Sequence, residues 1–259
     1  MSCRADLAVE AENLTRTFGT TIALDGATFT VAHGEVFGLL GPNGAGKTTT
    51  MRVLLTLLRP TAGRARVAGL DVATQRAAVR ARVGWVPQDR TVDPLLTAAE
   101  NVEFMAGMYH LTARAGRRRA ADLLGLAGLA EHKNRLARDL SGGMRRKLEL
   151  AMSLVNVPAV LFLDEPTLGL DISARRALWS YVRQIRDTGT TIVLTTHYLD
   201  EADRLCDRVA IIDSGRIRAV GTPTGLKDRF AVTTLDDVFL AATGQDLTEQ
   251  PAADQLMPS

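Results

Sequence analysis

A glycine-rich run that ends in lysine and threonine is the clearest sign of chemistry in this 259-residue sequence. It fits G-x-x-x-x-G-K-[ST], a pattern in which glycines let successive backbone N–H groups turn inward around a phosphate. The helix expected after it presents its positive N-terminal end to the same anion. Lys47 would supply a point charge to the β- and γ-phosphates, and the Thr48 hydroxyl would be placed to ligate Mg²⁺. The predicted phosphate-binding residues are Gly41, Pro42, Asn43, Gly44, Ala45, Gly46, Lys47, Thr48 and Thr49.

Two adjacent carboxylates follow an apolar segment later in the chain. Residues 160–163 are predicted to form a buried strand that ends at Asp164 and Glu165, and α/β proteins bind ligands at the carboxyl edge of their strands. Asp164 would take Mg²⁺, directly or through water, because this ion prefers oxygen ligands. Glu165 would face the attacking water as a general base. The alternative is a polar turn after a strand, which the phosphate-binding pattern upstream makes the weaker interpretation.

A serine followed by two glycines marks a third candidate segment. Ser141 is a natural helix N-cap, and Gly142 and Gly143 at the helix start expose free backbone N–H groups, which makes a second anion site. Alone, the segment would indicate a plain capped helix after a loop. Kinases and GTPases also combine a phosphate loop with acidic residues, so this third segment is the one that discriminates among nucleotide-binding proteins.

The elements that position these residues alternate between strands and helices. Val36–Leu40 is a continuous apolar run of strand length that leads into the phosphate loop, and an amphipathic helix should follow and end at 60–63. Strands alternating with helices predict a parallel α/β sheet. Apolar residues at helical spacing in 97–110, 114–126 and 144–155 predict a helical lobe inserted into it. The remaining expected elements are strands at 83–87, 192–195 and 209–212, helices at about 173–187 and 198–205, an N-terminal strand through Leu7, Val9 and Ala11, and a hairpin over 22–31 that turns near Asp25-Gly26.

Composition sets limits on the class of protein. Lysine plus arginine total 31 and aspartate plus glutamate 29, which gives a net charge of +2 and favours no nucleic-acid partner. No apolar stretch reaches the ~18 residues that span a bilayer, and the N-terminus has no secretory signal. The two cysteines, Cys3 and Cys206, form no CxxC, and Cys206 is expected to be a buried apolar thiol, in keeping with a reducing cytosol.

These segments together resemble the ATP-binding cassette (ABC) family over about residues 5–225. They are Phe18, GPNGAGKTT at 41–49, Gln88 after the strand at 83–87, LSGGM at 140–144, LFLDEP at 161–166, Gly169-Leu170-Asp171, and His197 in LTTHYLDEA, all in the family's order. The match is closest to the ATPase subunits of drug and antibiotic exporters of the daunorubicin-resistance type. The segments LSGGMRRKLELA, LDEPTLGLD, TTHYLDEADRLCDRVAIID and LDDVFLAATG look like that branch.

The resemblance implies roles for individual residues. Phe18 would stack on adenine through its aromatic face. Gln88 would lie near Mg²⁺ and the attacking water and report the γ-phosphate to the helical lobe. His197 would contact the γ-phosphate and help to orient the water or Glu165, and Asp171 would lie at a subunit boundary.

One position departs from the family pattern. Met144 stands where the family often has glutamine, and methionine cannot give amide hydrogen bonds, which weakens any contact with ribose. Ser141 and the amides of Gly142 and Gly143 are retained, so the phosphate contact should survive.

The resemblance also implies a fold and an assembly. The fold is a P-loop NTPase with a mainly parallel core sheet, an N-terminal antiparallel β subdomain and an α-helical subdomain inserted at about 89–156. The nucleotide-binding domain would cover 1–225, and a C-terminal helix and flexible tail 226–259. Two copies would sandwich ATP and Mg²⁺ head to tail, on the cytoplasmic face of the membrane, beside a separate integral-membrane permease. One alternative is a soluble ABC ATPase in translation or DNA maintenance, but the single cassette and the lack of a long coiled-coil insertion argue against it. The other alternative is a plain P-loop kinase or GTPase.

Overall fold

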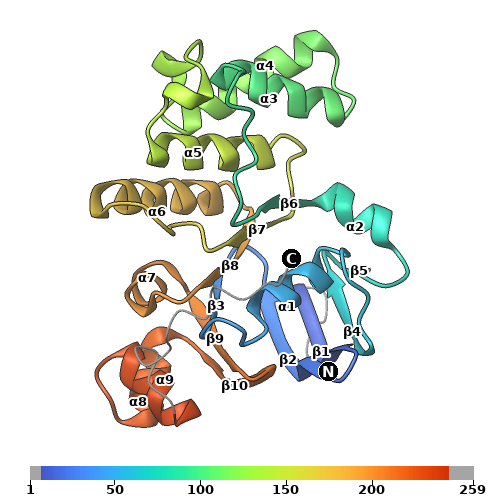
Figure 1. Ribbon diagram of the computed structural model, residues 1–259, viewed down its shortest axis with the longest axis vertical. Coiled ribbons are helices and arrows are strands. Elements are labelled where there is room, and N and C mark those ends of the chain that lie inside the picture. The colour runs from blue at the N-terminus through green and yellow to red at the C-terminus, as the bar shows by residue number, and fades with distance from the viewer. Residues whose placement is uncertain (1–6, 245–259) are drawn as a thin grey trace, which may run out of the picture.

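The computed structural model describes residues 7–244, arranged around a six-stranded sheet (Figure 1). The tail expected beyond about Gly244 and the cysteine at position 3 lie outside the described residues. The sheet has the order β10-β9-β3-β8-β7-β6, and five of its strands are parallel, while β10 runs antiparallel to β9. The strands are β3 (Val36–Leu40), β6 (Val83–Val86), β7 (Val160–Asp164), β8 (Thr191–Thr196), β9 (Arg208–Asp213) and β10 (Arg216–Gly221).

A second sheet, of four antiparallel strands, is formed mainly by the N-terminal part of the described chain. Its order is β2-β1-β4-β5. The expected hairpin turn near Asp25-Gly26 is wrong, because β2 runs through these residues and turns back toward β1 at Gly19 and Thr20 instead. Gly26 has a φ of 69°, and the β1–β2 register shifts beside it, so this Asp-Gly pair forms a bulge rather than a turn. The strands are β1 (Leu7–Phe18), β2 (Thr21–Ala32), β4 (Ala62–Val67) and β5 (Leu70–Asp71).

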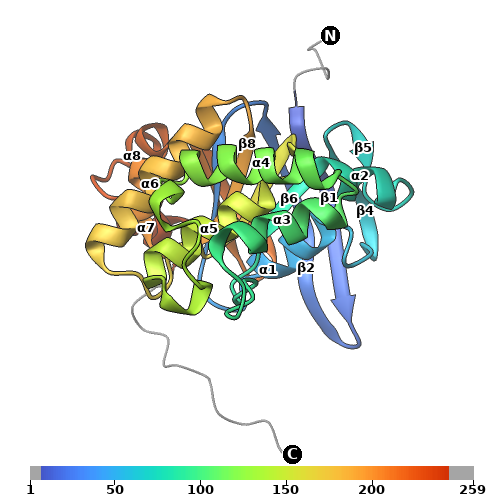
Figure 2. The same ribbon diagram turned by 90° about the horizontal axis from the view of Figure 1, so that it is seen from above.

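The helices expected between β6 and β7 pack on one another above the core sheet (Figures 1 and 2). We call these elements the helical lobe. Its first helix begins with a capping box, in which the side chains of Thr97 and Glu100 each accept a hydrogen bond from the other's backbone N–H. The lobe consists of α3 (Ala98–Met108), α4 (Ala113–Leu126), the short 3₁₀ turns η2 (Ala130–His132) and η3 (Ala137–Asp139), and α5 (Gly142–Ser153).

The remaining helices cover the sheets. The helix after the phosphate loop ends at Leu54, earlier than the expected boundary at 60–63, and Thr56 just beyond it has a left-handed φ of 63°. Both expected helices after β7 and β8 are confirmed. The helices are α1 (Lys47–Leu54), α2 (Arg76–Arg82), α6 (Ile172–Asp187), α7 (Leu199–Leu205), α8 (Pro223–Phe230) and α9 (Leu235–Thr243).

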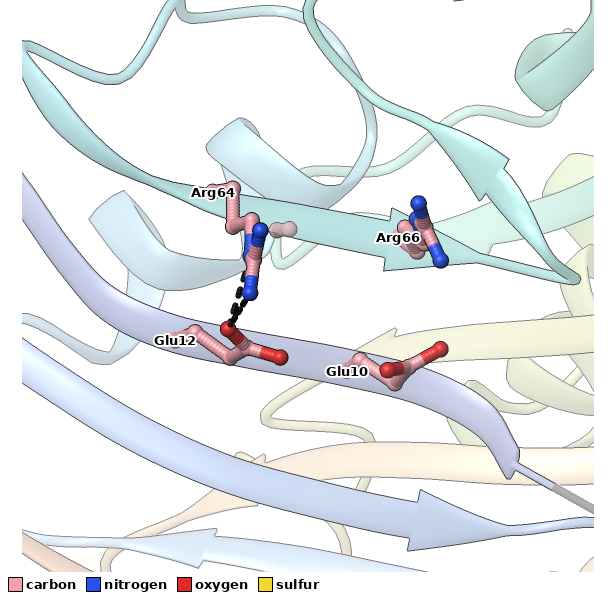
Figure 3. A pocket seen from close by; sticks show the side chains of 5 residues that line it. Glu10, Glu12, Arg64 and Arg66 are labelled. Carbon is pink, nitrogen blue, oxygen red and sulfur yellow. Dashed lines mark hydrogen bonds and ion pairs between the residues drawn. The ribbon is translucent and has the colours of Figure 1, made fainter. Parts of the chain in front are cut away.

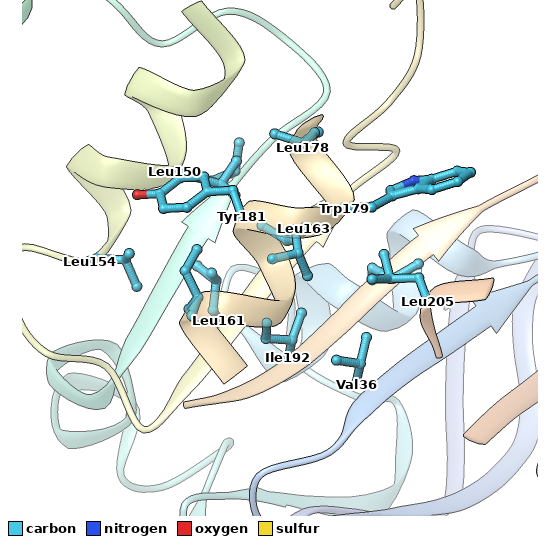
Figure 4. Packing of buried hydrophobic residues seen from close by; sticks show 14 of the residues in the cluster. Val36, Leu150, Leu154, Leu161, Leu163, Leu178, Trp179, Tyr181, Ile192 and Leu205 are labelled. Carbon is cyan, nitrogen blue, oxygen red and sulfur yellow. The ribbon is translucent and has the colours of Figure 1, made fainter. Parts of the chain in front are cut away.

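Helix α6 lies between the core sheet and α5 and ties the helical lobe to the sheet (Figure 4). Leu178 and Tyr181 of α6 pack in one buried cluster with Leu161 of β7 and Leu150 of α5. A second cluster fills the space between the two sheets, where the Phe29 and Phe37 rings stack with centroids 5.6 Å apart. Cys206 is buried, as expected. Because apolar area is removed from water on both faces of the core sheet, its strand ends are held rigidly.

The described residues contain no helix long and apolar enough to cross a bilayer.

Candidate active site

The glycine-rich loop joins β3 to the N-terminus of α1 at the carboxyl edge of the core sheet. Gly46 caps α1 with a φ of 106°, a left-handed conformation that favours glycine, and a Cβ there would lie 2.7 Å from the backbone oxygen of Ala23. A Cβ on Gly41 would collide with the backbone oxygen of Ile212. Packing therefore requires glycine at both positions, and at Gly46 the left-handed backbone favours it as well.

Lys47 is held between this loop and the acidic end of β7. Its side chain is 5% exposed, and Nζ donates hydrogen bonds to the backbone oxygens of Gly41 (2.7 Å) and Pro42 (3.0 Å). The same Nζ lies 3.6 Å from Glu165 Oε1. Burial lowers the pKa of Lys47, and the negative charges of Glu165 and Asp164 oppose that effect. The ammonium group is thus poised to meet an anion that enters the loop.

A cavity of about 470 Å³ opens beside the loop and brings together residues from five segments. Gln88 comes from the segment after β6, Glu165 from the end of β7 and His197 from the end of β8, because parallel strands end at one edge of the sheet. We call it the phosphate cavity. It is lined by Pro42, Asn43, Gly44, Gly46, Lys47, Thr48, Thr49, Gln88, Glu165 and His197, all of them predicted, and by Ala23 and Leu168, which were not.

Asp164 ends β7 and is 4% exposed. The β7–β8 register places it opposite Thr195, whose hydroxyl donates a hydrogen bond to Asp164 Oδ1. The same hydroxyl accepts a hydrogen bond from the backbone N–H of Glu165 at 3.0 Å. Thr195 therefore orients both acidic residues. Sequence reasoning missed it because a threonine inside an apolar strand carries no signal of its own.

Glu165 adopts an unusual backbone conformation for a non-glycine residue, with a φ of 46°. Its Oε2 lies 3.1 Å from His197 Nδ1, a close polar contact that lacks hydrogen-bond alignment. Burial alone would raise the pKa of Glu165, but the neighbouring His197 and Lys47 outweigh burial and hold that pKa below its ordinary value. The carboxylate is therefore ionised at neutral pH and able to accept a proton.

Ser141, Gly142, Gly143 and Asp171 line a different cavity, of about 430 Å³. Ser141 caps α5 by accepting a hydrogen bond from Met144 N at 3.3 Å, and Asp171 caps α6 by accepting one from Ala174 N at 2.8 Å. The two helix N-termini give this cavity a partly positive wall. We call it the signature cavity. It shares no lining residue with the phosphate cavity, and Met144 is also part of its wall.

Phe18 lines neither cavity. It ends β1, its side chain is 43% exposed, and the Arg16 guanidinium carbon lies 4.4 Å from the ring centroid. The face covered by arginine is engaged in a cation–π contact. Adenine stacking on Phe18 therefore stays a prediction.

Arg146 joins the signature helix to the phosphate cavity, a link that sequence reasoning missed. The guanidinium is buried and donates hydrogen bonds to the backbone oxygens of Pro87, Asp164 and Pro166. It also pairs with Glu149 at 2.6 Å. One side chain thus connects the segments that carry Gln88 and Glu165 to α5. The only signal of it in the sequence is a charged residue on the buried face of an amphipathic helix.

A hollow on the outer face of β1 and β4 is no candidate site (Figure 3). Its accessible volume is about 10 Å³, too small for a ligand. Glu12 pairs with Arg64 across the strands, and Glu10 lies opposite Arg66. Such alternating pairs stabilise neighbouring strands and leave little net charge to attract a partner.

Comparison with known proteins agrees with this geometry. A family model described as ABC transporter matches residues 24–168. The chain is 47% identical over 241 residues to the daunorubicin resistance ATP-binding protein DrrA3 of Streptomyces coeruleorubidus, covering 93% of this chain and 76% of that protein. Among solved structures, an ATP-binding subunit of an ABC transporter superposes with a TM-score of 0.80 at 29% identity, over 91% of this chain and 99% of that one. An ATP-binding cassette in a dimeric post-hydrolysis state bound to ADP and Pi has a TM-score of 0.72 at 26% identity, over 83% and 98% of the two chains.

Proposed function

We propose that this chain, which belongs to the ABC transporter family, hydrolyses ATP at two composite sites formed by two head-to-tail copies and so drives export through a separate membrane subunit. As a member of the family the chain is an ATPase. The two-copy site, the residue roles, the cargo and the partner are the proposal. The proposal also divides the chain into a nucleotide-binding domain at 1–225, with the helical insertion at about 89–156, and a C-terminal part at 226–259.

The observation that carries the proposal is that the two anion-binding groups line different cavities of one chain. The phosphate cavity contains the lysine, the glutamate and the histidine, whereas the signature cavity contains the capped N-terminus of α5, and no lining residue is common to both. A γ-phosphate bound to the first cavity of one copy is free to meet Ser141 of another. The dimeric relative bound to ADP and Pi supports an assembly of this kind.

The residues of the phosphate cavity suit attack by water on the γ-phosphate. Lys47 balances the charge of the transferred group, and the backbone of the loop holds the phosphates in place. Glu165 accepts a proton from the attacking water on a carboxylate oxygen. His197, 3.1 Å from Glu165 Oε2, steadies that carboxylate and faces the same space.

The donor set of the site fits Mg²⁺. Thr48 offers a hydroxyl and Gln88 an amide oxygen in the phosphate cavity, and Asp164 offers a carboxylate at the end of β7, directly before the cavity residue Glu165. This ion prefers hard oxygen ligands. The hydroxyl of Thr195 holds the Asp164 carboxylate in a fixed orientation, as is common for groups that support metal ligands. When bound, the ion would neutralise charge on the β- and γ-phosphates.

Replacing Ser141 with arginine is expected to block ATP-induced dimerisation while ATP binding persists. The long cationic side chain would fill the signature cavity, where the γ-phosphate of the other copy should enter. Size-exclusion chromatography with ATP, in a Glu165→Gln background that prevents turnover, measures the dimer. Thr112→Arg is the matched control, because it alters another exposed helix N-cap, that of α4, away from both cavities. A normal dimer for Ser141→Arg would contradict the two-copy site.

The membrane subunit is proposed to dock on the helical lobe near α3. Leu95, Phe104 and Met108 are each more than 60% exposed although they are large and apolar, which is typical of a contact surface. The site includes part of the segment from Gln88 to Asn101, which leads from the phosphate cavity into the helical lobe. In this proposal the chain lies on the cytoplasmic face of the membrane and a partner carries the transport path.

Affinity purification of this chain from detergent-extracted membranes is expected to recover an integral-membrane protein with it. Recovery of the ATPase without one would favour the alternative, an ABC ATPase with no transport role. The cargo proposed is a drug, an antibiotic or a lipid-like compound, supported by the daunorubicin resistance named for the relative. A drug-accumulation assay on cells that express both subunits tests the cargo.

A further inference from the structure

A buried carboxylate outside both cavities connects the two loops that hold Glu165 and His197. Glu201, on α7, is 0% exposed and lines neither the phosphate cavity nor the signature cavity. Its Oε1 accepts a hydrogen bond from Trp179 Nε1 at 2.9 Å. Its Oε2 accepts two more, from the hydroxyls of Thr167 (3.0 Å) and Thr196 (2.7 Å). All of its partners are themselves buried, so this network is shielded from water.

The two threonines lie beside different catalytic residues. Thr167 lies two residues after Glu165, and Thr196 directly precedes His197. The Thr196 hydroxyl also accepts a hydrogen bond from the backbone N–H of Tyr198 at 3.0 Å, so both neighbours of His197 are fastened through it. A single oxygen of Glu201 thereby sets the position of the loop after β7 relative to the loop after β8.

Glu165 has particular need of such support because its backbone is strained. A non-glycine residue with a φ of 46° is maintained only when the surrounding contacts determine it. On its N-terminal side, the Glu165 N–H is bound by the backbone oxygen of Thr195 at 3.2 Å and by the Thr195 hydroxyl. On its C-terminal side, two buried bonds hold the chain: Arg146 donates to the backbone oxygen of Pro166, and the Thr167 hydroxyl donates to Glu201.

We propose that Glu201 is a positioning residue for hydrolysis, one that keeps the Glu165 carboxylate and the His197 imidazole at their working separation. The inference rests on the proposed function, which assigns the proton-accepting role to Glu165. A carboxylate is suited to the task because both of its oxygens accept, and three donors converge on it. Glutamine has one accepting end only, so it cannot satisfy Trp179 and the two threonines together.

The buried charge is compensated within the network. Burial raises the pKa of Glu201, and the hydrogen bonds from Thr196, Trp179 and Thr167, together with the charge of Arg175, oppose that rise. The guanidinium of Arg175 lies 4.6 Å from the ring centroid of Tyr198, whose own ring is 4.1 Å from that of His197. The Arg175 guanidinium thus lies over the ring of the residue that follows His197.

Glu201→Gln is expected to lower ATP turnover by about tenfold to about a hundredfold, because small misplacements of reacting groups cost that much. ATP affinity, measured by titration calorimetry, should not change, since Glu201 does not line the phosphate cavity. Adding Trp179→Phe removes the donor that faces the amide NH₂, and turnover of the double variant should return to the level of Trp179→Phe alone. A merely structural role would not separate turnover from affinity in this way.

Thr167→Val provides a second measurement if Glu201→Gln does not fold. It deletes only the hydroxyl that connects Glu201 to the Glu165 loop and should lower turnover in the same manner, with affinity unchanged. Parental turnover in Thr167→Val or Glu201→Gln, or equal losses of turnover and affinity, would overturn the inference. Glu165→Gln is assayed in parallel: if it hydrolyses ATP normally, the proposed function fails, whereas an inactive Glu165→Gln beside a fully active Glu201→Gln refutes the positioning role alone.

Discussion

Replacing Lys47 with alanine is expected to weaken ATP binding by about tenfold to about 150-fold. Loss of one charge-assisted hydrogen bond between the ammonium and a phosphate costs about 1.5–3 kcal/mol, and a change of 1.4 kcal/mol is about tenfold in affinity. The loss is larger than for an exposed lysine because Nζ is buried beside the loop, 3.6 Å from Glu165, where water screens its charge poorly. Titration calorimetry with ATP measures the effect.

Lys47→Ala is also expected to change the phosphate loop when no nucleotide is bound. Lys47 Nζ bridges the backbone oxygens of Gly41 and Pro42, so its removal loosens the loop as well as the phosphate contact. Thermal unfolding of the free protein shows whether the fold survives. Lys227→Ala is the matched control, because it removes a lysine ion pair with Asp203, at 2.7 Å, that lies outside both cavities. Parental ATP affinity in Lys47→Ala would refute the role of the loop in phosphate binding.

Glu165→Gln is expected to reduce ATP turnover by at least about a hundredfold, the usual range for loss of a general base. Glutamine keeps the size of the side chain but accepts no proton at neutral pH. ATP binding should persist, because the phosphate contacts come from Lys47 and the loop, and a carboxylate that repels the γ-phosphate is gone. Phosphate release measures turnover.

Accumulation of an ATP-bound dimer is the second expected result for this variant. If the γ-phosphate joins two copies, preventing its removal keeps the closed state populated. Size-exclusion chromatography detects that species. Glu131→Gln, which neutralises an exposed carboxylate on the helical lobe, is the control. Turnover near the parental rate would show that Glu165 is not the base, and a monomer with ATP bound would refute the γ-phosphate as the link between copies.

The two experiments separate binding from chemistry at neighbouring groups. Lys47 and Glu165 lie 3.6 Å apart, yet one should control affinity and the other turnover. Glu201→Gln should behave like a weaker Glu165→Gln, with turnover reduced and affinity retained. Ser141→Arg should affect neither ATP affinity nor the Lys47–Glu165 pair but only the encounter of two copies.

Contiguous patterns in the sequence were sufficient to predict the phosphate loop, the acidic end of β7 and the capped helix at Ser141. Each of these depends on a few neighbouring residues: glycines that permit the loop, an apolar run of strand length, and a side-chain oxygen at a helix start. The alternation of strands and helices also predicted a parallel sheet, and the apolar run before Asp164 predicted that this carboxylate lies at the carboxyl edge of that sheet. The places of Gln88 and His197 were implied only by the resemblance to the ABC family.

Tertiary structure decided whatever depends on contacts between distant segments. The Asp-Gly pair at 25–26 has the local chemistry of a turn, but pairing of β2 with β1 makes it a bulge. Thr195 and Glu201 lie about thirty residues or more from the partners they hold at Asp164 and Thr167, and no periodicity in the sequence records such pairings. A buried hydrogen bond forms only when packing brings a donor and an acceptor together and excludes water. For that reason the sequence by itself predicted which residues would perform the chemistry, while the fold determined which residues hold them in place and divided them between two cavities.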